Sequence, residues 1–461
     1  MRIAAVAAGL LLVAACKGGD DDKQATTTPV VAGTTWHQDA APIFSENCIQ
    51  CHTSAGVAAF LDLTQYDQAV AWAPVIASNA SEGTMPPFGA VETTECENRW
   101  GFLHDARLTP EEVVLVQAWV DDGTLEGDPA TAAPLLQPDI PQLARVDHEI
   151  APQTAHTTQG SQALKDEFYC FVFDPEVSET RWVEGLQVQP DNISVVHHVL
   201  LNVASRADAE AADAADGVVD GIYPCFGGVG VAGARLIGGW IPGGGPTEYP
   251  EGSGAELRAD EVLVAQMHYH NTVDPQTDST SVQIMWTETE PPFPALIELL
   301  GNAADASQGL QPGPSDPNGA AEFLIPAGDA SHVETSRHEL PIPEGVEVDV
   351  FLVAPHMHYA GVSMRAWVEH ADGSPNDCLV HVPAWDFDWQ LLYFFDATNR
   401  NAPVVKSGDT LVLECIYNNT LDNGGLASVL AEAGIDEPTD IGLGGGSLEE
   451  MCLLGVGAMV R

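Results

Sequence analysis

The sequence predicts a multidomain protein, in which a small all-α domain is followed by two antiparallel β-sandwich domains of the jelly-roll type. The chain has 461 residues, enough for two or three domains. Helical periodicity becomes scarce beyond a proline-containing stretch at 129–152, which we interpret as a linker. After it, runs rich in β-branched and aromatic residues alternate with Gly, Pro, Asn and Asp turns, at 168–173, 195–203, 262–269, 282–286, 346–354 and 411–417. The sandwiches are expected at 153–290 and 291–461.

The N-terminus is typical of an exported protein. An apolar run at 3–15 is too short to span a bilayer as a stable anchor. Small residues stand directly before Cys16, which resembles a bacterial lipoprotein signal in which this cysteine is lipidated; an ordinary signal peptide is the alternative. We expect a signal peptide at 1–15, a flexible tether at 16–33 and an extracytoplasmic protein that is lipid-anchored to a bacterial membrane. No later stretch is apolar enough for another span.

The amino-acid composition limits the kinds of partner that the protein can bind and indicates its redox compartment. Asp and Glu number 67 against 16 Lys and Arg, and the formal net charge of −51 excludes nucleic acid as a partner. The acidic residues are spread along the chain, so we interpret them as a solubility feature. Nine cysteines are present, and an even number remains for disulfides once Cys16, Cys48 and Cys51 are assigned to lipid and haem.

The stretch at 48–52 reads CIQCH, the attachment pattern of a c-type haem. Cys48 and Cys51 would form thioethers with the porphyrin, and His52 would ligate the iron. A CxxC pair can instead be redox-active or bind zinc. Met85, in the loop-like sequence TMPP, is the expected sixth iron ligand, and His104 is its rival.

Helical patterns flank this motif. Residues 36–47 have an amphipathic pattern that leads into CxxCH, and Thr109, followed by Pro and two Glu, opens a second helix that runs to about residue 122. The segment at 34–128 resembles a small bacterial class I cytochrome c. This resemblance implies an all-α domain that carries one haem c.

Histidines are clustered on three predicted strands. His197 and His198 are adjacent, His268 lies in the run QMHYH, and His356 and His358 are two apart. Residues two apart on a strand share one face, so the last two are suited to hold one metal. His197 and His198 would face opposite ways on a regular strand, and they can share a metal only if the backbone twists or if they use different ring nitrogens. Neutral imidazoles with a thioether favour copper, particularly Cu(I).

The order of these motifs resembles the copper type II, ascorbate-dependent monooxygenases, the family of peptidylglycine α-hydroxylating monooxygenase and dopamine β-monooxygenase. The similarity covers roughly 155–461. It rests on the segments SVVHHVLLNV, GGWIPGGGPTEYPEGSGAEL, VLVAQMHYHN, LVAPHMHYAG, PAWDFDWQLLYFF, LVLECIYNNT and LEEMCLLGVGAM. Ala354 and Gly455 depart from the arginine and the tyrosine of the peptide-amidating members, which argues against a C-terminal glycine peptide as substrate.

The resemblance implies two copper sites, with the ligands His197, His198 and His268 in one and His356, His358 and Met451 in the other. The first would store and pass an electron, and the second would bind O2 and hydroxylate the substrate. Gln266 stands at a position proposed in the family to aid coupling. Cys415 and Cys452 match a family disulfide that would hold Met451 in place. Cys170 with Cys225 is a plausible second pair, whereas Cys96 and Cys378 have no assignment.

The resulting hypothesis is an enzyme: a copper-dependent monooxygenase that hydroxylates a C–H bond of a small-molecule substrate with O2. Its cofactors would be two copper ions and one haem c. Each turnover needs two electrons, which the haem would pass on from ascorbate, another external reductant or a redox protein. One alternative is a copper- and haem-binding electron-transfer lipoprotein without substrate oxidation. Another is a zinc-binding or structural sandwich with an appended cytochrome.

Overall fold

The computed structural model describes residues 33–54, 56–136, 141–160, 166–270 and 272–461. The predicted signal peptide, the tether and the lipidation at Cys16 lie outside these ranges. Thr34–Arg461 form one compact unit, which is mostly β-sheet with few helices. Within the described part of the chain, no helix combines the length and the apolar character needed to cross a membrane.

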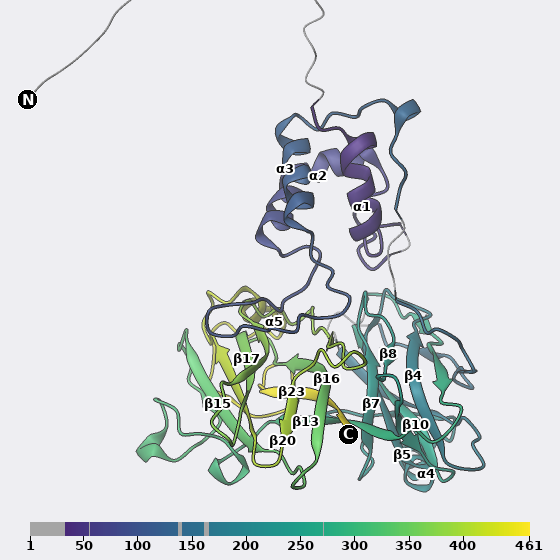
Figure 1. Ribbon diagram of the computed structural model, residues 1–461, viewed down its shortest axis with the longest axis vertical. Helices are drawn as coiled ribbons and strands as arrows, with labels where there is room; N and C mark the ends of the chain where they lie inside the picture. The colour runs from purple at the N-terminus through teal and green to yellow at the C-terminus, as the bar shows by residue number, and fades with distance from the viewer. Residues whose placement is uncertain (1–32, 55, 137–140, 161–165, 271) are drawn as a thin grey trace, which may run out of the picture. The chain divides into compact units, whose positions relative to one another are not determined.

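The first part of this unit contains a group of helices, drawn in purple and blue in Figure 1. Here η1 (Trp36–Ala40), α1 (Ala41–Asn47), α2 (Tyr66–Glu82) and α3 (Pro110–Asp121) surround a small apolar core. The helix expected after Thr109 is confirmed as α3, because Thr109 and Glu112 cap its first turn reciprocally. The other helices are short: η2 (Pro129–Thr131), α4 (Arg206–Asp213), η3 (Ala214–Asp216), η4 (Ala306–Gln308), η5 (Pro317–Gly319) and α5 (Gly424–Glu432).

The prediction of a small all-α cytochrome c domain at 34–128 was wrong. After α2 the chain leaves the helices, and residues 83–108, which we call the crossing segment, contain no helix. Phe88 belongs to the main core of the β region, and the ring of Phe102 packs 5.1 Å from that of Phe395. Burying an aromatic side chain stabilises a fold by about 1.5–3 kcal/mol. The crossing segment therefore packs the helical part of the chain against the sheets. The helices do not form a separate domain.

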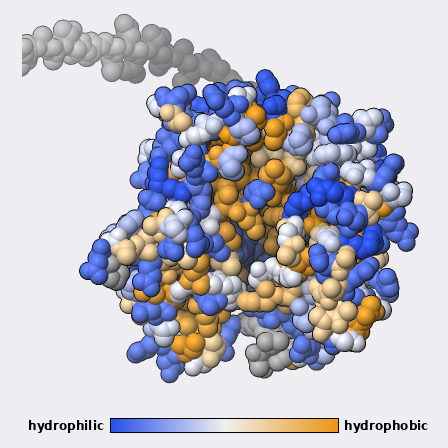
Figure 2. Space-filling model, turned by 90° about the horizontal axis from the view of Figure 1, so that it is seen from below, coloured by the Kyte–Doolittle hydropathy of each residue, from blue (hydrophilic) through white to orange (hydrophobic). Residues whose placement is uncertain are grey.

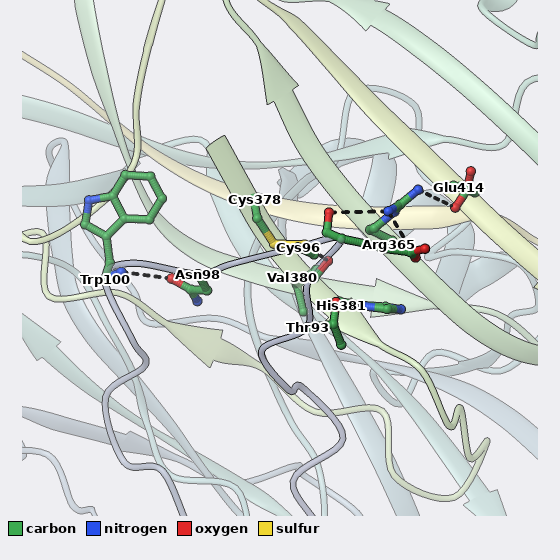
Figure 3. The surroundings of a disulfide bond; sticks show 10 residues. Thr93, Cys96, Asn98, Trp100, Arg365, Cys378, Val380, His381 and Glu414 are labelled. Atoms are coloured by element: carbon green, nitrogen blue, oxygen red, sulfur yellow. Dashed lines mark hydrogen bonds and ion pairs between the residues drawn. A yellow bond between two sulfur atoms is a disulfide. The ribbon is translucent and has the colours of Figure 1, made fainter. Parts of the chain in front are cut away.

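A disulfide between Cys96 and Cys378 fastens the crossing segment to β18 (Figure 3). Beside it, the hydroxyl of Thr93 lies 2.9 Å from Nδ1 of His381. The other two disulfides join pairs that were named from the sequence, Cys170–Cys225 and Cys415–Cys452. Such bonds persist in oxidising compartments, and the three together are consistent with an extracytoplasmic protein.

The rest of the chain is built mainly from strands, and all six strand-like runs of the sequence form strands. The first strand, β1, already lies within the stretch expected to be a linker. The strands are β1 (His148–Ile150), β2 (His156–Thr157), β3 (Asp166–Phe173), β4 (Arg181–Gln189), β5 (Val196–Ser205), β6 (Ile222–Pro224), β7 (Arg235–Trp240), β8 (Thr247–Glu248), β9 (Ser253–Leu257), β10 (Glu261–His270), β11 (Thr277–Asp278), β12 (Ser281–Trp286), β13 (Phe293–Gly301), β14 (Leu324–Ile325), β15 (His332–Glu339), β16 (Glu347–His356), β17 (Gly361–Glu369), β18 (Asp377–Val382), β19 (Tyr393–Phe394), β20 (Val404–Lys406), β21 (Thr410–Tyr417), β22 (Ile441–Gly442) and β23 (Leu453–Val460).

One ten-stranded sheet runs through both halves of the β region. Its order is β1-β12-β4-β9-β13-β23-β16-β19, with β8 beside β4 and β20 beside β16. A five-stranded sheet, β6-β3-β10-β5-β7, and a four-stranded sheet, β15-β21-β17-β18, complete the core. The halves are joined by a parallel pair, in which Phe293 of β13 stands opposite Ser253 of β9. The expected pair of separate sandwich domains is thus corrected to two halves that share a sheet, since β9 and β13 pair where each would otherwise leave an open edge.

The surface reflects the acidic composition of the chain. In the view of Figure 2, hydrophobic residues gather at the centre around a hollow, and hydrophilic residues cover the flanks. The formal net charge of −51 agrees with this largely hydrophilic surface.

Candidate metal centres

The first histidine cluster lies on two neighbouring strands, β5 and β10. His268 stands opposite His198, but the next residue, Tyr269, stands opposite Val196, so His197 is an extra residue in β5. Such a bulge rotates the local backbone. It brings the ring of His197 to the side of the other two histidines. The backbone twist that a shared metal requires is therefore present.

The three imidazoles of this cluster, which we call the trihistidine cluster, converge through the same ring nitrogen. Every pair of Nδ1 atoms of His197, His198 and His268 is separated by 3.2 Å. The centre of such a triangle lies about 1.8 Å from each nitrogen, close to the roughly 2.0–2.1 Å of a metal–imidazole bond. Three lone pairs that face one another are stable only around a shared cation or proton. The donor set therefore fits a transition-metal ion, copper and zinc included.

Asp166, on β3, fixes the orientation of one ligand. Nε2 of His268 lies 2.9 Å from a carboxylate oxygen of Asp166, so Nε2 donates its proton and Nδ1 keeps its lone pair for the cluster. Burial and the neighbouring His268 lower the pKa of His197 to about 3. Burial also places the pKa of His198 well below its usual range. These two imidazoles are thus neutral at neutral pH, as metal ligation requires.

We expect Asp166→Asn to weaken copper binding at the trihistidine cluster by about 10- to 100-fold, because an amide accepts the His268 proton less strongly than a carboxylate does. The measurement is the Cu(I) affinity, obtained by competition with a chromophoric chelator. Asp208→Asn, at an exposed position on α4, is the matched control and should bind copper like the wild type. Equal affinities for the two variants would show that Asp166 does not orient the ligand.

The second histidine pair lies at the end of β16. His356 is its last residue, and His358 follows in the loop, so the expectation that both stand on one strand was only half right. Their ring centroids are nevertheless 5.2 Å apart. Nδ1 of His356 donates to Oε1 of Gln390 (2.6 Å), and Nδ1 of His358 donates to the carbonyl oxygen of Glu449 (2.9 Å). Both Nε2 atoms therefore carry the free lone pairs.

Glu450 joins this histidine pair to Met451. One of its oxygens accepts the backbone N–H groups of His358 (2.8 Å) and Met451 (3.1 Å). The other accepts those of Ala360 (2.7 Å) and Gly361 (3.2 Å). Burial raises the pKa of Glu450 to about 7, although its backbone donors act to lower it. The backbones of His358 and Met451 thus donate to the same Glu450 oxygen, which brings the backbone of the expected thioether ligand close to that of His358. We call this group the methionine cluster.

Two further contacts restrain Met451 from the side of β21. The hydroxyl of Tyr417 donates to the carbonyl oxygen of Met451 (2.7 Å). The next residue, Cys452, forms the disulfide with Cys415. Both β21 partners are fully buried, so the backbone around the thioether is held by the rigid centre of a sheet.

The segment 385–390 contacts both clusters. The ring of Phe387 lies 6.1 Å from that of His197 and 6.0 Å from that of His358. A carboxylate oxygen of Asp388 lies 4.0 Å from Nε2 of His197. Phe387 therefore contacts one histidine of the trihistidine cluster and one of the methionine cluster. Gln266, by contrast, is buried on β10, and its side-chain amide donates to the carbonyl oxygen of Gly228 (3.0 Å).

The expected haem-attachment residues lie directly after α1. Among the described cysteines, Cys48 and Cys51 are the two that form no disulfide. Burial, reinforced by Cys51 and Glu112, raises the pKa of Cys48 to about 12, and burial lowers the pKa of His52. Nδ1 of His52 is buried without a hydrogen-bond partner. Two free thiols beside an imidazole with one unpaired ring nitrogen fit covalent attachment of haem c.

A cavity of about 1120 Å³ opens beside these residues. Typical ligand sites measure roughly 300–1000 Å³, so the space suffices for a porphyrin. Its lining includes the apolar side chains of Phe44 and Trp72. Both candidate sixth ligands, Met85 and His104, also line it. Both candidate sixth ligands therefore belong to the same cavity as His52.

Sequence reasoning missed the residues that position the ligands. Asp166 and Gln390 stand at no characteristic spacing from the histidines that they bond, so no pattern signals them. Glu450 was quoted as part of the sequence LEEMC, but no role was assigned to it. Glu450 stands directly before the apolar run 451–460. An acidic residue at such a position could have indicated a carboxylate that is buried and hydrogen-bonded.

Comparisons with known proteins identify no relative. No family model matches the chain, and no curated protein matches it. A solved structure, the major capsid protein P2 of bacteriophage PM2, is 8% identical with a TM-score of 0.26, covering 68% of this chain and 97% of its own. Allantoicase is 11% identical with a TM-score of 0.14, covering 57% and 81%. The tandem CBM22 domains of Paenibacillus barcinonensis Xyn10C are 10% identical with a TM-score of 0.09, covering 64% and 71%.

Proposed function

We propose that the protein is a copper-dependent monooxygenase that hydroxylates a C–H bond of a small molecule with O2. The observation that supports this best is that Phe387 contacts two histidine groups: the three convergent imidazoles, and the pair His356 and His358, whose backbone shares a Glu450 oxygen with that of Met451. Bound copper would supply one-electron chemistry and the activation of O2. The mixed nitrogen and sulfur donors of the methionine cluster suit Cu(I), so we assign substrate oxidation to that cluster and electron storage to the trihistidine cluster.

The reaction places one oxygen atom in the substrate and releases the other as water, which consumes two electrons and two protons. We propose that haem c, attached to Cys48 and Cys51 with His52 and Met85 as iron ligands, passes these electrons from ascorbate or another external donor. An electron-transfer protein without substrate oxidation would use the same groups. A lipid anchor at Cys16 would hold either protein at a bacterial membrane.

Cofactor content tests this proposal. We expect protein exported to an oxidising periplasm to carry two copper ions and one covalent haem c per chain, and to consume O2 when a reductant is added. His198→Ala should lose one copper and keep the haem, because it removes one of three converging ligands. Elemental analysis, haem-stained gels and an oxygen electrode give the readouts. Zinc in place of copper would contradict the proposal, and copper that is reduced without any O2 consumption would favour the electron-transfer protein.

A further inference from the structure

We infer that electrons reach the trihistidine cluster from the haem site of the same chain, through a docking face formed by the loop 241–246 and His270. The inference rests on the proposed function, because it requires both haem c and copper. It goes beyond that function by assigning the electron route to one chain and by naming the residues that position the two redox sites. Three independent observations carry it.

The attachment motif touches the loop directly. Nε2 of Gln50, between the two attachment cysteines, donates to the carbonyl oxygen of Gly243 (3.0 Å). A Cβ atom placed on Gly243 would lie 3.7 Å from the sulfur of Cys51. Gly243 also has a positive φ of 78°, which glycine adopts without strain. The loop backbone therefore comes close to the thiol that would carry the porphyrin.

The same loop leads directly to the copper ligands. It follows β7, whose last residue, Trp240, is buried and stands opposite Val199 of β5. Val199 follows His198 in the sequence. A short run of paired backbone thus links the attachment motif to one ligand of the trihistidine cluster.

The cavity connects the two sites through space as well. Cys51 and His52 line one part of it, and His197 and His270 line another. The rings of His197 and His270 are 6.1 Å apart. A porphyrin held by the attachment cysteines would therefore share this open cavity with His197, a ligand of the trihistidine cluster. Apolar surroundings such as those of Trp240 exclude water and lower the local dielectric between the sites.

The proposed electron-transfer step moves one electron and no proton. With both groups bound, Cys48, Cys51 and His52 would hold the haem iron that gives up one electron, and the trihistidine cluster would hold the copper(II) that accepts it. An external one-electron donor then restores the ferrous iron. Gln50 would act as a positioning residue in this step, because its hydrogen bond to Gly243 holds the attachment motif against the loop 241–246.

Anaerobic kinetics test the route without any substrate. Protein loaded with ferric haem and Cu(II) receives a substoichiometric pulse of a one-electron reductant, and the reoxidation of the haem is followed by its absorbance. We expect a first-order decay whose rate does not change with protein concentration. Gln50→Leu, which removes the donor to Gly243 without changing charge, should slow this decay by about tenfold, as small misplacements of reacting groups do.

The matched control is Gln65→Leu, since Gln65 is exposed, lies at the start of α2 and does not line the cavity. Both variants should keep the wild-type haem spectrum, haem midpoint potential and copper content, which separates misplacement from misfolding. A decay rate proportional to protein concentration, or equal rates for the two variants, would overturn the inference. Missing haem or missing copper in the wild type would instead refute the proposed function.

Discussion

Replacing Met451 with Ala is expected to abolish reductant-driven O2 consumption while haem c and the trihistidine copper stay in place. Met451 supplies the soft donor of the methionine cluster, and its backbone is held by Glu450 and Tyr417. Alanine leaves that backbone unchanged but removes the thioether. Loss of an outer-shell partner of a ligand typically costs about 10- to 100-fold, so loss of the ligand itself should lower the rate by at least about 100-fold.

The readouts for this variant are the O2-consumption rate, the copper content and the rate of haem reduction by ascorbate. Met459→Ala is a suitable control, because Met459 lies on β23, is 1% exposed and stands opposite Asp349, at the other end of β16 from His356. The control should lose stability through its cavity yet keep its O2 consumption per folded molecule. Full activity of Met451→Ala would remove the methionine cluster from the proposed chemistry.

Strands and ligand types could be predicted from the sequence because they depend on local pattern. The apolar runs gave β5, β10 and β16, and the histidines within them marked the clusters. The bulge at His197 could not be predicted, since it depends on how β5 pairs with a strand about 70 residues away. The relation between Ala354 and Gly455 could not be predicted either. In the sequence they are two separate differences from the pattern of the monooxygenases that the chain resembles, but in the structure they stand directly opposite each other on β16 and β23.

The prediction of a small all-α domain was wrong for a different physical reason. CxxCH and the flanking helical patterns favoured a self-contained helical domain. Phe88 and Phe102 follow no helical or strand period, so nothing in the sequence shows that they belong to the core of the sheets. Cys96 and Cys378 are 282 residues apart, and their pairing becomes visible only when the crossing segment is seen against β18. Long-range packing of irregular segments is the part of this fold that local pattern does not encode.

Glu450→Gln is expected to damage both stability and the methionine cluster. The side chain of Glu450 is fully buried, and its two oxygens accept four backbone N–H groups. Glutamine keeps one oxygen and turns an NH2 donor toward two of those N–H groups. Each buried donor left without an acceptor costs about 1–3 kcal/mol, so we expect a loss of roughly 2–6 kcal/mol in the free energy of unfolding. Denaturant unfolding measures this loss.

The same substitution should also weaken copper binding at the methionine cluster, because one Glu450 oxygen joins the backbone of His358 to that of Met451. Glu437→Gln is the matched control: it makes the same chemical change at an exposed side chain that is not part of the methionine cluster. We expect the control to unfold and to bind copper like the wild type. If Glu450→Gln lost stability but kept its copper affinity and O2 consumption, the carboxylate would serve the fold alone. Loss of all three properties would show that the fold and the methionine cluster depend on the same buried group.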